Sequence, residues 1–339
     1  MKAVGPIGVV GAGSWGSTLS QLLAAKGYRV DLWVYEESLC RTIQTTRENT
    51  DYLPGFRLHE NVAAHHELHR VVEDHDLVLM VVPSHVYRQT AVRMIPCLKR
   101  NAVIVSATKG IENGTLLLMS DIWKDILPDP DAVPVLALSG PSFAREVIRN
   151  IPTAIVVAGE DLDLAVRVQQ IFSTSAFRVY TSSDTRGVEL AGALKNIIAI
   201  AAGISDGLGF GHNTRAALIT RGLAEMSRLG VKMGANVLTF SGLSGIGDLL
   251  LTCTGDLSRN RQVGLQLGQG RKIEEILKEM RMVAEGVKTA ESVHYLAQQL
   301  RVDMPICEQV YQVVHAGRQP ETAVQALMER NLKHELEIL

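Results

Sequence analysis

The stretch from Val188 to Ser205, VELAGALKNIIAIAAGIS, is apolar on every side of a helical wheel, yet Lys195 lies near its middle. Burial disfavours the charged form of a lysine and lowers its pKa, so a sheltered amine can donate or accept a proton near neutral pH. The neighbouring Asn196 is a second polar group that is costly to bury without a partner. We therefore predict a general acid or base at Lys195. The alternative is that its methylene stem carries the amine out to solvent.

A second group of polar residues could bind an anionic substrate. Asp248 is the only charged residue in the glycine-rich stretch 234–255, and Ser258, Arg259 and Asn260 follow it as a compact set of donors. Arginine binds phosphate oxygens through a planar fork, and serine and asparagine add neutral donors. The alternative is an ordinary helix N-cap followed by an exposed arginine.

The segment IGVVGAGSWG places Gly11, Gly13 and Gly16 in the G-x-G-x-x-G spacing, between a strand-like run and a helix-like run. In that context the first glycine permits a tight turn, the second lets the backbone approach a pyrophosphate, and the third lets the helix pack closely on the sheet. The N–H groups at the start of the helix attract phosphate. The loop therefore predicts dinucleotide binding, and the alternative is a structural turn.

The end of the second expected strand, DLWVYEES, bears on the choice between NAD and NADP. An acidic residue about 20 positions after such a loop binds the ribose 2′-hydroxyl of NAD, whereas a basic residue favours the 2′-phosphate of NADP. Glu36 and Glu37 lie near that position, and Arg41 is the nearest arginine beyond them. This favours NAD; the alternative is that both glutamates are solvated loop residues.

Three further strand-like runs end in polar or small residues, in the segments VVPSH, SATKG and LSGPS. Ligands of doubly wound sheets bind beyond the carboxyl ends of the strands, so Lys109 is expected to point into a ligand crevice. Gly140 and Ser142 could bring backbone and hydroxyl donors to a small polar substrate.

The elements that would position these residues differ between the two halves of the chain. The first half alternates helix-like segments with continuously apolar runs such as LVLMVVP, which are typical of parallel strands covered on both faces. From about Gly187 onward, the segments carry helical periodicity. We predict an α/β fold, with a doubly wound sheet over residues 1–188 and an all-α domain over residues 189–339.

Composition favours a soluble, cytoplasmic protein. The 339 residues are 46% hydrophobic and 21% charged with a net charge of -2, which does not suggest a nucleic-acid binder. The four scattered cysteines suit a reducing compartment. The N-terminal apolar run is too short for a signal peptide, and no stretch approaches the roughly 20 apolar residues that span a bilayer.

The segment HHELH could offer a metal pair, because His65 and His69 would lie one turn apart on a helix. No third ligand accompanies them, so we predict a solvated face and no metal site.

Taken together, the motifs closely resemble one family, the bacterial NAD(P)-dependent sn-glycerol-3-phosphate dehydrogenases. The resemblance covers almost the whole chain, and its motifs occur in order: GAGSWG, VVPSH, SATKGIE, LSGPSFAREV, ELAGALKNIIAIAAGISDGL, GLSGIGDLLLTCTGDLSRNR and VAEGVKTA. It implies a Rossmann-type domain followed by a helical domain, and a role in supplying glycerol phosphate for phospholipid synthesis.

The resemblance also implies roles for single residues. Lys195 would be the proton donor to the carbonyl oxygen of dihydroxyacetone phosphate, and the acceptor in reverse. The implied substrate-binding residues are Lys109, Gly140, Ser142 and Asp248, with Ser258, Arg259 and Asn260 on the phosphate. The implied NAD- or NADP-binding residues are Gly11, Gly13, Ser14, Trp15, Gly16, Lys109, Ala144, Arg259, Val283 and Glu285.

This chain departs from the family at the second strand, where Tyr35 and Glu36 stand in place of the basic pair that many members carry. The departure leaves the usual NADP preference open.

Two other functions remain as alternatives. A related reductase would act on a 3-hydroxy acid or on ketopantoate, and Arg259 would then bind a carboxylate. A non-catalytic dinucleotide sensor would bind cofactor and use its helical half for partners. For the dehydrogenase itself we expect dihydroxyacetone phosphate or glycerol 3-phosphate as the small-molecule substrate, no nucleic-acid partner, no stable membrane insertion and a possible homodimer.

Overall fold

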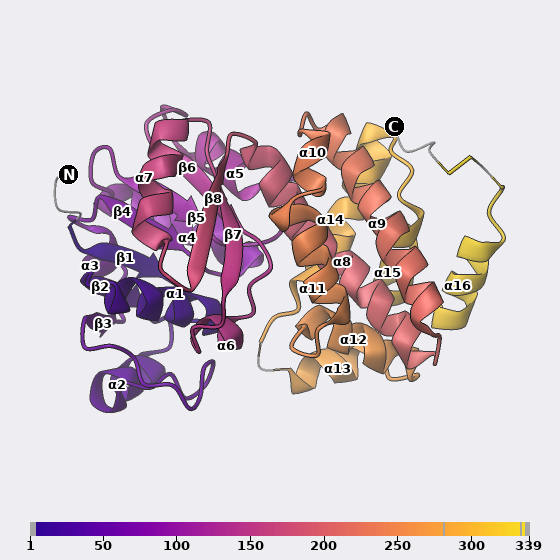
Figure 1. The fold of residues 1–339 in the computed structure, drawn as a ribbon, viewed down its shortest axis with the longest axis horizontal. Helices are drawn as coiled ribbons and strands as arrows, with labels where there is room; N and C mark the ends of the chain where they lie inside the picture. The colour runs from indigo at the N-terminus through magenta and orange to yellow at the C-terminus, as the bar shows by residue number, and fades with distance from the viewer. Residues whose placement is uncertain (1–4, 281, 333, 336–339) are drawn as a thin grey trace. The chain divides into compact units, whose positions relative to one another are not determined.

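The structure is a computed structural model that describes residues 5–280, 282–332 and 334–335 (Figure 1). The chain divides into two compact units. Unit 1 comprises Met1–Thr108, Met119–Leu138 and Ser142–Thr185, and unit 2 comprises Lys109–Leu118, Ser139–Pro141 and Arg186–Leu339. Two short segments that follow strands, including Lys109 and Gly140, are therefore part of the mostly helical unit 2.

Unit 1 is built on an eight-stranded sheet with the order β3-β2-β1-β4-β5-β6-β7-β8. β1 pairs in parallel with both β2 and β4, so the direction of winding reverses at β1. Such a switch point is where doubly wound sheets bind ligands. The strands are β1 (Ile7–Val10), β2 (Val30–Trp33), β3 (Val62–His65), β4 (Leu77–Met80), β5 (Val103–Ser106), β6 (Val135–Ser139), β7 (Thr153–Ala158) and β8 (Phe177–Ser182).

Helices cover this sheet. β1 and β4 are buried at every position, as expected of central strands with helices on both faces. The connecting helices are α1 (Ser14–Ala25), α2 (Glu37–Thr46), α3 (His69–Val72), α4 (Ser84–Met94), the 3-10 turn η1 (Ile95–Cys97), α5 (Met119–Ile126), α6 (Ala144–Val147) and α7 (Leu162–Phe172). The Rossmann-type fold predicted from the sequence is confirmed.

From Arg186 onward, the regular secondary structure of unit 2 is helical in the residues that the structure describes. Its central element is α8 (Thr185–Gly207), whose apolar residues form the middle of a single hydrophobic core. The other elements are α9 (His212–Lys232), α10 (Val237–Phe240), the π-helical turn η2 (Leu243–Gly247), α11 (Asp248–Thr254), α12 (Arg259–Gly268), α13 (Ile273–Glu279), α14 (Glu285–Leu300), α15 (Pro305–His315) and α16 (Pro320–Met328).

The metal pair considered for His65 and His69 would need a shared helix, which the structure does not contain. His65 ends β3 and His69 begins α3, so the two histidines do not share a helix. His65 Nε2 instead lies 2.8 Å from Oδ1 of Asp31 on β2. Residues Val62–His65 form β3, a short strand at the sheet edge that pairs with β2.

The expectation that no stretch approaches the length of a membrane span is wrong. Two segments are long and apolar enough to cross a membrane, Thr185–Gly207 and Val237–Thr254. The first is α8, whose most apolar window is 100% buried inside the protein, as in the core helix of a globular unit. The second is 39% buried and is interrupted by the non-helical backbone of Gly245. Length and composition alone therefore do not separate a core helix from a membrane span.

Candidate active site

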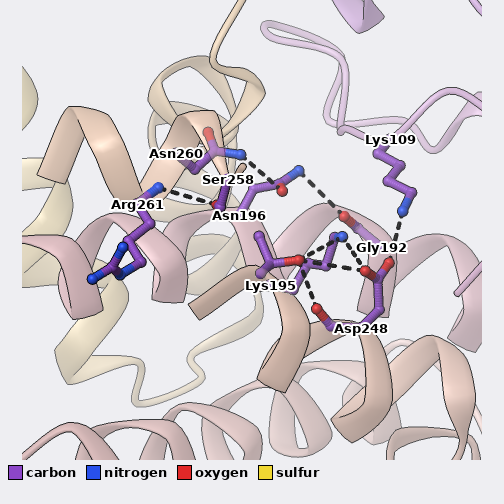
Figure 2. Close-up of polar contacts among 9 residues, drawn as sticks. Lys109, Gly192, Lys195, Asn196, Asp248, Ser258, Asn260 and Arg261 are labelled. Carbon is purple, nitrogen blue, oxygen red and sulfur yellow. Dashed lines mark hydrogen bonds and ion pairs between the residues drawn. The ribbon is translucent and has the colours of Figure 1, made fainter. Parts of the chain in front are cut away.

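Lys195 lies on α8 inside unit 2, with only 5% of its surface exposed. Its Nζ donates to Oδ1 of Asp248 at 2.5 Å and to Oγ1 of Thr252 at 2.9 Å (Figure 2). Asp248 is the first residue of α11 and Thr252 lies four residues after it, which places both side chains on one face of that helix. The Thr252 hydroxyl in turn donates to the Asp248 carbonyl at 2.6 Å. The amine is therefore held inside the protein, and its stem does not carry it to solvent.

A second lysine shares the same carboxylate. Lys109 Nζ donates to Oδ2 of Asp248 at 2.7 Å, and its side chain is half-buried. The segment that carries Lys109 passes close to α8, because a Cβ added to Gly192 would lie 3.6 Å from Cγ of Lys109. Two ammonium groups on one carboxylate leave a local excess of positive charge when all three groups are ionised.

Burial sets the titration of this cluster. The pKa of Lys195 is lowered to about 7 in total: burial lowers it most, the charge of Asp248 raises it, and the nearby charge of Lys109 lowers it. For Asp248, burial acts to raise the pKa, but the two lysines together lower it below its ordinary value. The cluster thus contains an ionised carboxylate and an amine that can exchange a proton near neutral pH.

Helix α12 lies directly against α8. A Cβ added to Gly203 would lie 2.0 Å from the carbonyl oxygen of Arg261, and one added to Gly264 would lie 2.0 Å from that of Ile200. Only glycine permits this approach of two backbones, and it fixes the start of α12 close to Asn196. The side chain of Asn260 donates to Oδ1 of Asn196 at 2.9 Å.

The polar group at the start of α12 is mostly engaged within the protein. Ser258 is the N-cap and accepts from the N–H of Arg261 at 3.2 Å. Besides its bond to Asn196, Asn260 accepts from the N–H of Gly286 at 2.9 Å. Both side chains are buried, whereas Arg259 is exposed. The N-cap with an exposed arginine is therefore present, and the N–H groups of the first helical turn lie next to that arginine.

The glycine loop in unit 1 has the geometry that its spacing predicts. Gly11 has φ +119°, and a Cβ there would lie 2.9 Å from the backbone of Val81. A Cβ on Gly16 would lie 1.9 Å from the carbonyl oxygen of Gly11, so the first turn of α1 sits tightly on the loop. By contrast, no described protein atom lies within 4 Å of a Cβ built on Gly13. The backbone of Gly13 is open to a ligand at the N-terminus of α1.

The other sequence-predicted cofactor residues of unit 1 surround this loop. Ser14 and Trp15 form the first turn of α1, and the Trp15 ring lies 6.5 Å from that of Phe177. Thr18 Oγ1 donates to the carbonyl oxygen of Ala144 at 3.3 Å, which places α6 beside α1. This arrangement fits the pyrophosphate of a dinucleotide, because an open backbone and unpaired helix N–H groups face the same space.

Glu36 is not a solvated loop residue. It is the N-cap of α2, and its Oε1 accepts from the Tyr52 hydroxyl at 2.7 Å. Burial, with the charge of Glu36, raises the pKa of Tyr52 to about 12. Glu37, in contrast, is exposed and pairs with Arg41 at 2.5 Å. An anchored carboxylate therefore follows β2.

The remaining predicted residues occupy loops and helix starts. Gly140 follows β6 with φ +146° in unit 2, and Ser142 belongs to unit 1. Val283 precedes α14, and Glu285 is the first residue of that helix. Glu285 lies close enough to Arg259 for their charges to interact.

Sequence reasoning missed one residue of this site and one carboxylate that supports the helices around it. Thr252 was not singled out, although its spacing of four from Asp248 in a helical segment is a usable signal. Asp206 was also missed; it accepts from Arg215 at 2.5 Å and from Arg261 at 2.7 Å, and it links the end of α8 to α9 and α12. Its partners are distant in sequence, so no local pattern reveals it.

Two family models match the chain. The C-terminal model of NAD-dependent glycerol-3-phosphate dehydrogenase matches residues 184–325, and the N-terminal model matches residues 6–165.

Curated relatives and a solved structure agree with these models. A glycerol-3-phosphate dehydrogenase [NAD(P)+] from Syntrophobacter fumaroxidans is 65% identical over 100% of this chain and 99% of its own length. One from Geobacter sp. strain M21 is 58% identical over 97% of this chain and 98% of its own length. The crystal structure of glycerol-3-phosphate dehydrogenase from Coxiella burnetii has a TM-score of 0.93 and 41% identity, covering 96% of this chain and 99% of that one.

Proposed function

Since the chain belongs to the NAD-dependent glycerol-3-phosphate dehydrogenase family, we propose that it catalyses the reversible reduction of dihydroxyacetone phosphate to sn-glycerol 3-phosphate with NAD(H) or NADP(H). The observation that carries this proposal is the buried Lys195, which is held by Asp248 and Thr252. A nicotinamide cofactor supplies or accepts the hydride when it is bound.

Lys195 is the proton donor to the substrate carbonyl oxygen in reduction, and the acceptor in the reverse direction. During reduction, negative charge develops on that oxygen, so a cation aimed at it acts mainly in the transition state. A pKa of about 7 lets Lys195 serve both directions near neutral pH. Asp248 keeps the amine in place, and Lys109 adds a second positive charge for substrate binding.

Arg259 binds the substrate phosphate, together with the N–H groups at the start of α12. Helix N-termini and arginine both favour phosphate. Because the Ser258 and Asn260 side chains are engaged with the protein, we assign them to the support of this turn, with their backbone groups available to the phosphate. Gly140 and Ser142 supply backbone and hydroxyl donors to the rest of the substrate.

The cofactor is bound at the glycine loop by Gly11, Gly13, Ser14, Trp15 and Gly16. Ala144, Val283, Glu285, Lys109 and Arg259 complete the set of cofactor-binding residues in this proposal. Glu36 is anchored at the end of β2, where a carboxylate suits the ribose 2′-hydroxyl of NAD.

The proposal includes a cytoplasmic location and a role in supplying glycerol phosphate for phospholipid synthesis. The four cysteines are all free thiols, which suits a reducing compartment. The net charge of -2 gives no basis for binding nucleic acid, and the burial of α8 gives no basis for membrane insertion. A homodimer is the proposed assembly.

The test follows nicotinamide absorbance with NADH and NADPH in parallel. We expect oxidation with dihydroxyacetone phosphate and much slower oxidation with unphosphorylated dihydroxyacetone, because the phosphate contributes remote binding energy. Faster turnover of ketopantoate or of a 3-keto acid would identify a related reductase instead. Cofactor binding without any substrate-dependent change would indicate a sensor.

Lys195→Ala tests the catalytic assignment. We expect turnover to fall by a factor of about 10² to 10⁴ while cofactor affinity survives, because Lys195 acts on the substrate oxygen. An equal loss of cofactor affinity would contradict the assignment.

A further inference from the structure

Unit 2 contains a cavity of about 420 Å³ that includes none of the active-site residues described above. Residues of α8, α9, α15, α16 and the segment after α16 line it. Within this group, α15 contacts both α9 and α16, and the three helices can be followed in Figure 1. The volume lies within the range of small-molecule sites.

The walls of the cavity are largely apolar. Ile204 comes from α8, Leu218 from α9, Val310 and Val313 from α15, and Leu327 from α16. The free energy falls when an apolar body displaces water from such walls, so they favour an apolar ligand.

A buried hydroxyl among the lining residues lacks a partner. Ser205 on α8 is 2% exposed, and its Oγ has no hydrogen-bond partner among the residues that the structure describes. Buried polar atoms are nearly always paired, so this hydroxyl calls for a polar atom from an occupant. Ser205 lies ten residues after Lys195 on the same helix, about 15 Å along its axis, so the cavity is separate from the active site.

The lining also carries three arginines. Arg330 pairs with Asp303 at 2.7 Å, and among the described residues no carboxylate lies within ion-pair distance of the other two. Arg221 and Arg228 are seven residues apart on α9, which places them on one face of the helix with Glu225. Arg221 donates to the carbonyl oxygen of Glu335 at 3.4 Å, and Arg228 to that of Asp303. A neutral carbonyl does not cancel the charge of a guanidinium. Glu225 is 2% exposed and accepts from the N–H groups at the start of α15. Among the described residues, Arg221 and Arg228 with the one carboxyl of Glu225 leave a net charge that one anionic group would balance.

We propose that this cavity binds an amphipathic monoanion. Its apolar body fills the space between α9, α15 and α16, its acid group pairs with Arg221 and Arg228, and a polar atom along the body bonds the Ser205 hydroxyl.

The test uses a matched pair of fluorescent probes with the full-length protein at a saturating concentration of NAD⁺. The NAD⁺ keeps the probes out of the dinucleotide site. The probe 8-anilinonaphthalene-1-sulfonate carries an anionic group on an apolar body, and N-phenyl-1-naphthylamine has the same body without the charge. We expect saturable binding of the anionic probe at one site, and weaker binding of the neutral one.

Three variants locate the site. Arg221→Ala should weaken binding of the anionic probe on the order of tenfold, since it removes a charge-assisted bond. It should leave the affinity for the neutral probe unchanged. Lys232→Ala removes an exposed cation from the same helix outside the cavity and should change the affinity for neither probe. Leu327→Trp fills the cavity and should abolish binding of both probes, while thermal unfolding and dihydroxyacetone phosphate reduction stay near wild type.

Three results would overturn the proposal. The first is unsaturable binding of the anionic probe, or binding that is equal in wild type and in Arg221→Ala. The second is binding that persists in a folded Leu327→Trp variant. The third is that neither probe binds because a second copy of the chain occupies the cavity. Sedimentation would then show a dimer for wild type and a monomer for Leu327→Trp. If Leu327→Trp does not fold, the comparison of Arg221→Ala with Lys232→Ala decides.

Discussion

Asp248→Asn tests whether one carboxylate holds the two lysines of the active site. Asparagine keeps the shape of the side chain but removes the charge, and its NH₂ group must face one of the two ammonium groups as donor against donor. Asp248 is 1% exposed and Lys195 is 5% exposed. Removing one partner from a buried pair costs about 3–5 kcal/mol, because the remaining charge is left uncompensated. We expect the free energy of unfolding at pH 7 to fall by that amount, and turnover to fall with it.

The assay is urea unfolding of wild type and variant between pH 4 and 8. The lysines lower the pKa of Asp248, so its stabilising contribution is present above the unfolded pKa of 3.8 and is lost as the pH falls through the folded value. The gap in the free energy of unfolding should therefore persist down to pH 4, because the contribution of Asp248 is lost only at lower pH.

The control is Asp256→Asn, which removes a 90% exposed carboxylate paired with Arg261 at 2.9 Å. Exposed ion pairs contribute little to stability, so the free energy of unfolding of this variant should differ from wild type by about 0.5 kcal/mol or less. If the two substitutions changed the free energy of unfolding equally, or if Asp248→Asn did not change it, the idea of a shared buried carboxylate would be refuted.

Three further substitutions probe single contacts. Thr252→Val removes the hydroxyl that Lys195 bonds, and we expect kcat to fall on the order of tenfold with KM little changed, whereas the exposed Thr254→Val should leave both constants unchanged. Burial raises the pKa of Glu225 from 4.5 to about 7, so wild type should lose about 3 kcal/mol of stability as the pH rises from 4.5 through 7, and Glu225→Gln should abolish that slope in urea unfolding. Glu36→Arg should raise kcat/KM for NADPH relative to NADH on the order of tenfold, because an arginine there can pair with the 2′-phosphate; an unchanged ratio would show that Glu36 does not select the cofactor.

The sequence predicts features whose cause is local. The spacing of Gly11, Gly13 and Gly16 predicts both the tight turn and the close helix packing that the structure shows. Likewise, Lys195 reads as buried because its own helix is apolar all round, and the structure places it at 5% exposure.

Features that depend on distant partners were not predictable in this way. Asp206 gains its role from arginines on two other helices, and the engagement of Asn260 depends on Gly286 and Asn196. The position of His65 on β3 was not predicted either, because the pairing of this four-residue strand with β2 is set by tertiary contact.

The pH profile of kcat/KM for dihydroxyacetone phosphate reduction tests the central claim most directly, since it reports the titration of the essential acid in the free enzyme. The account predicts a plateau below about pH 7 and a tenfold fall per pH unit above it, because the pKa of Lys195 is lowered to about 7. The profile of glycerol 3-phosphate oxidation should rise over the same range. A rate that stays level between pH 6 and 9, or an unchanged profile in the residual activity of Lys195→Ala, would contradict it.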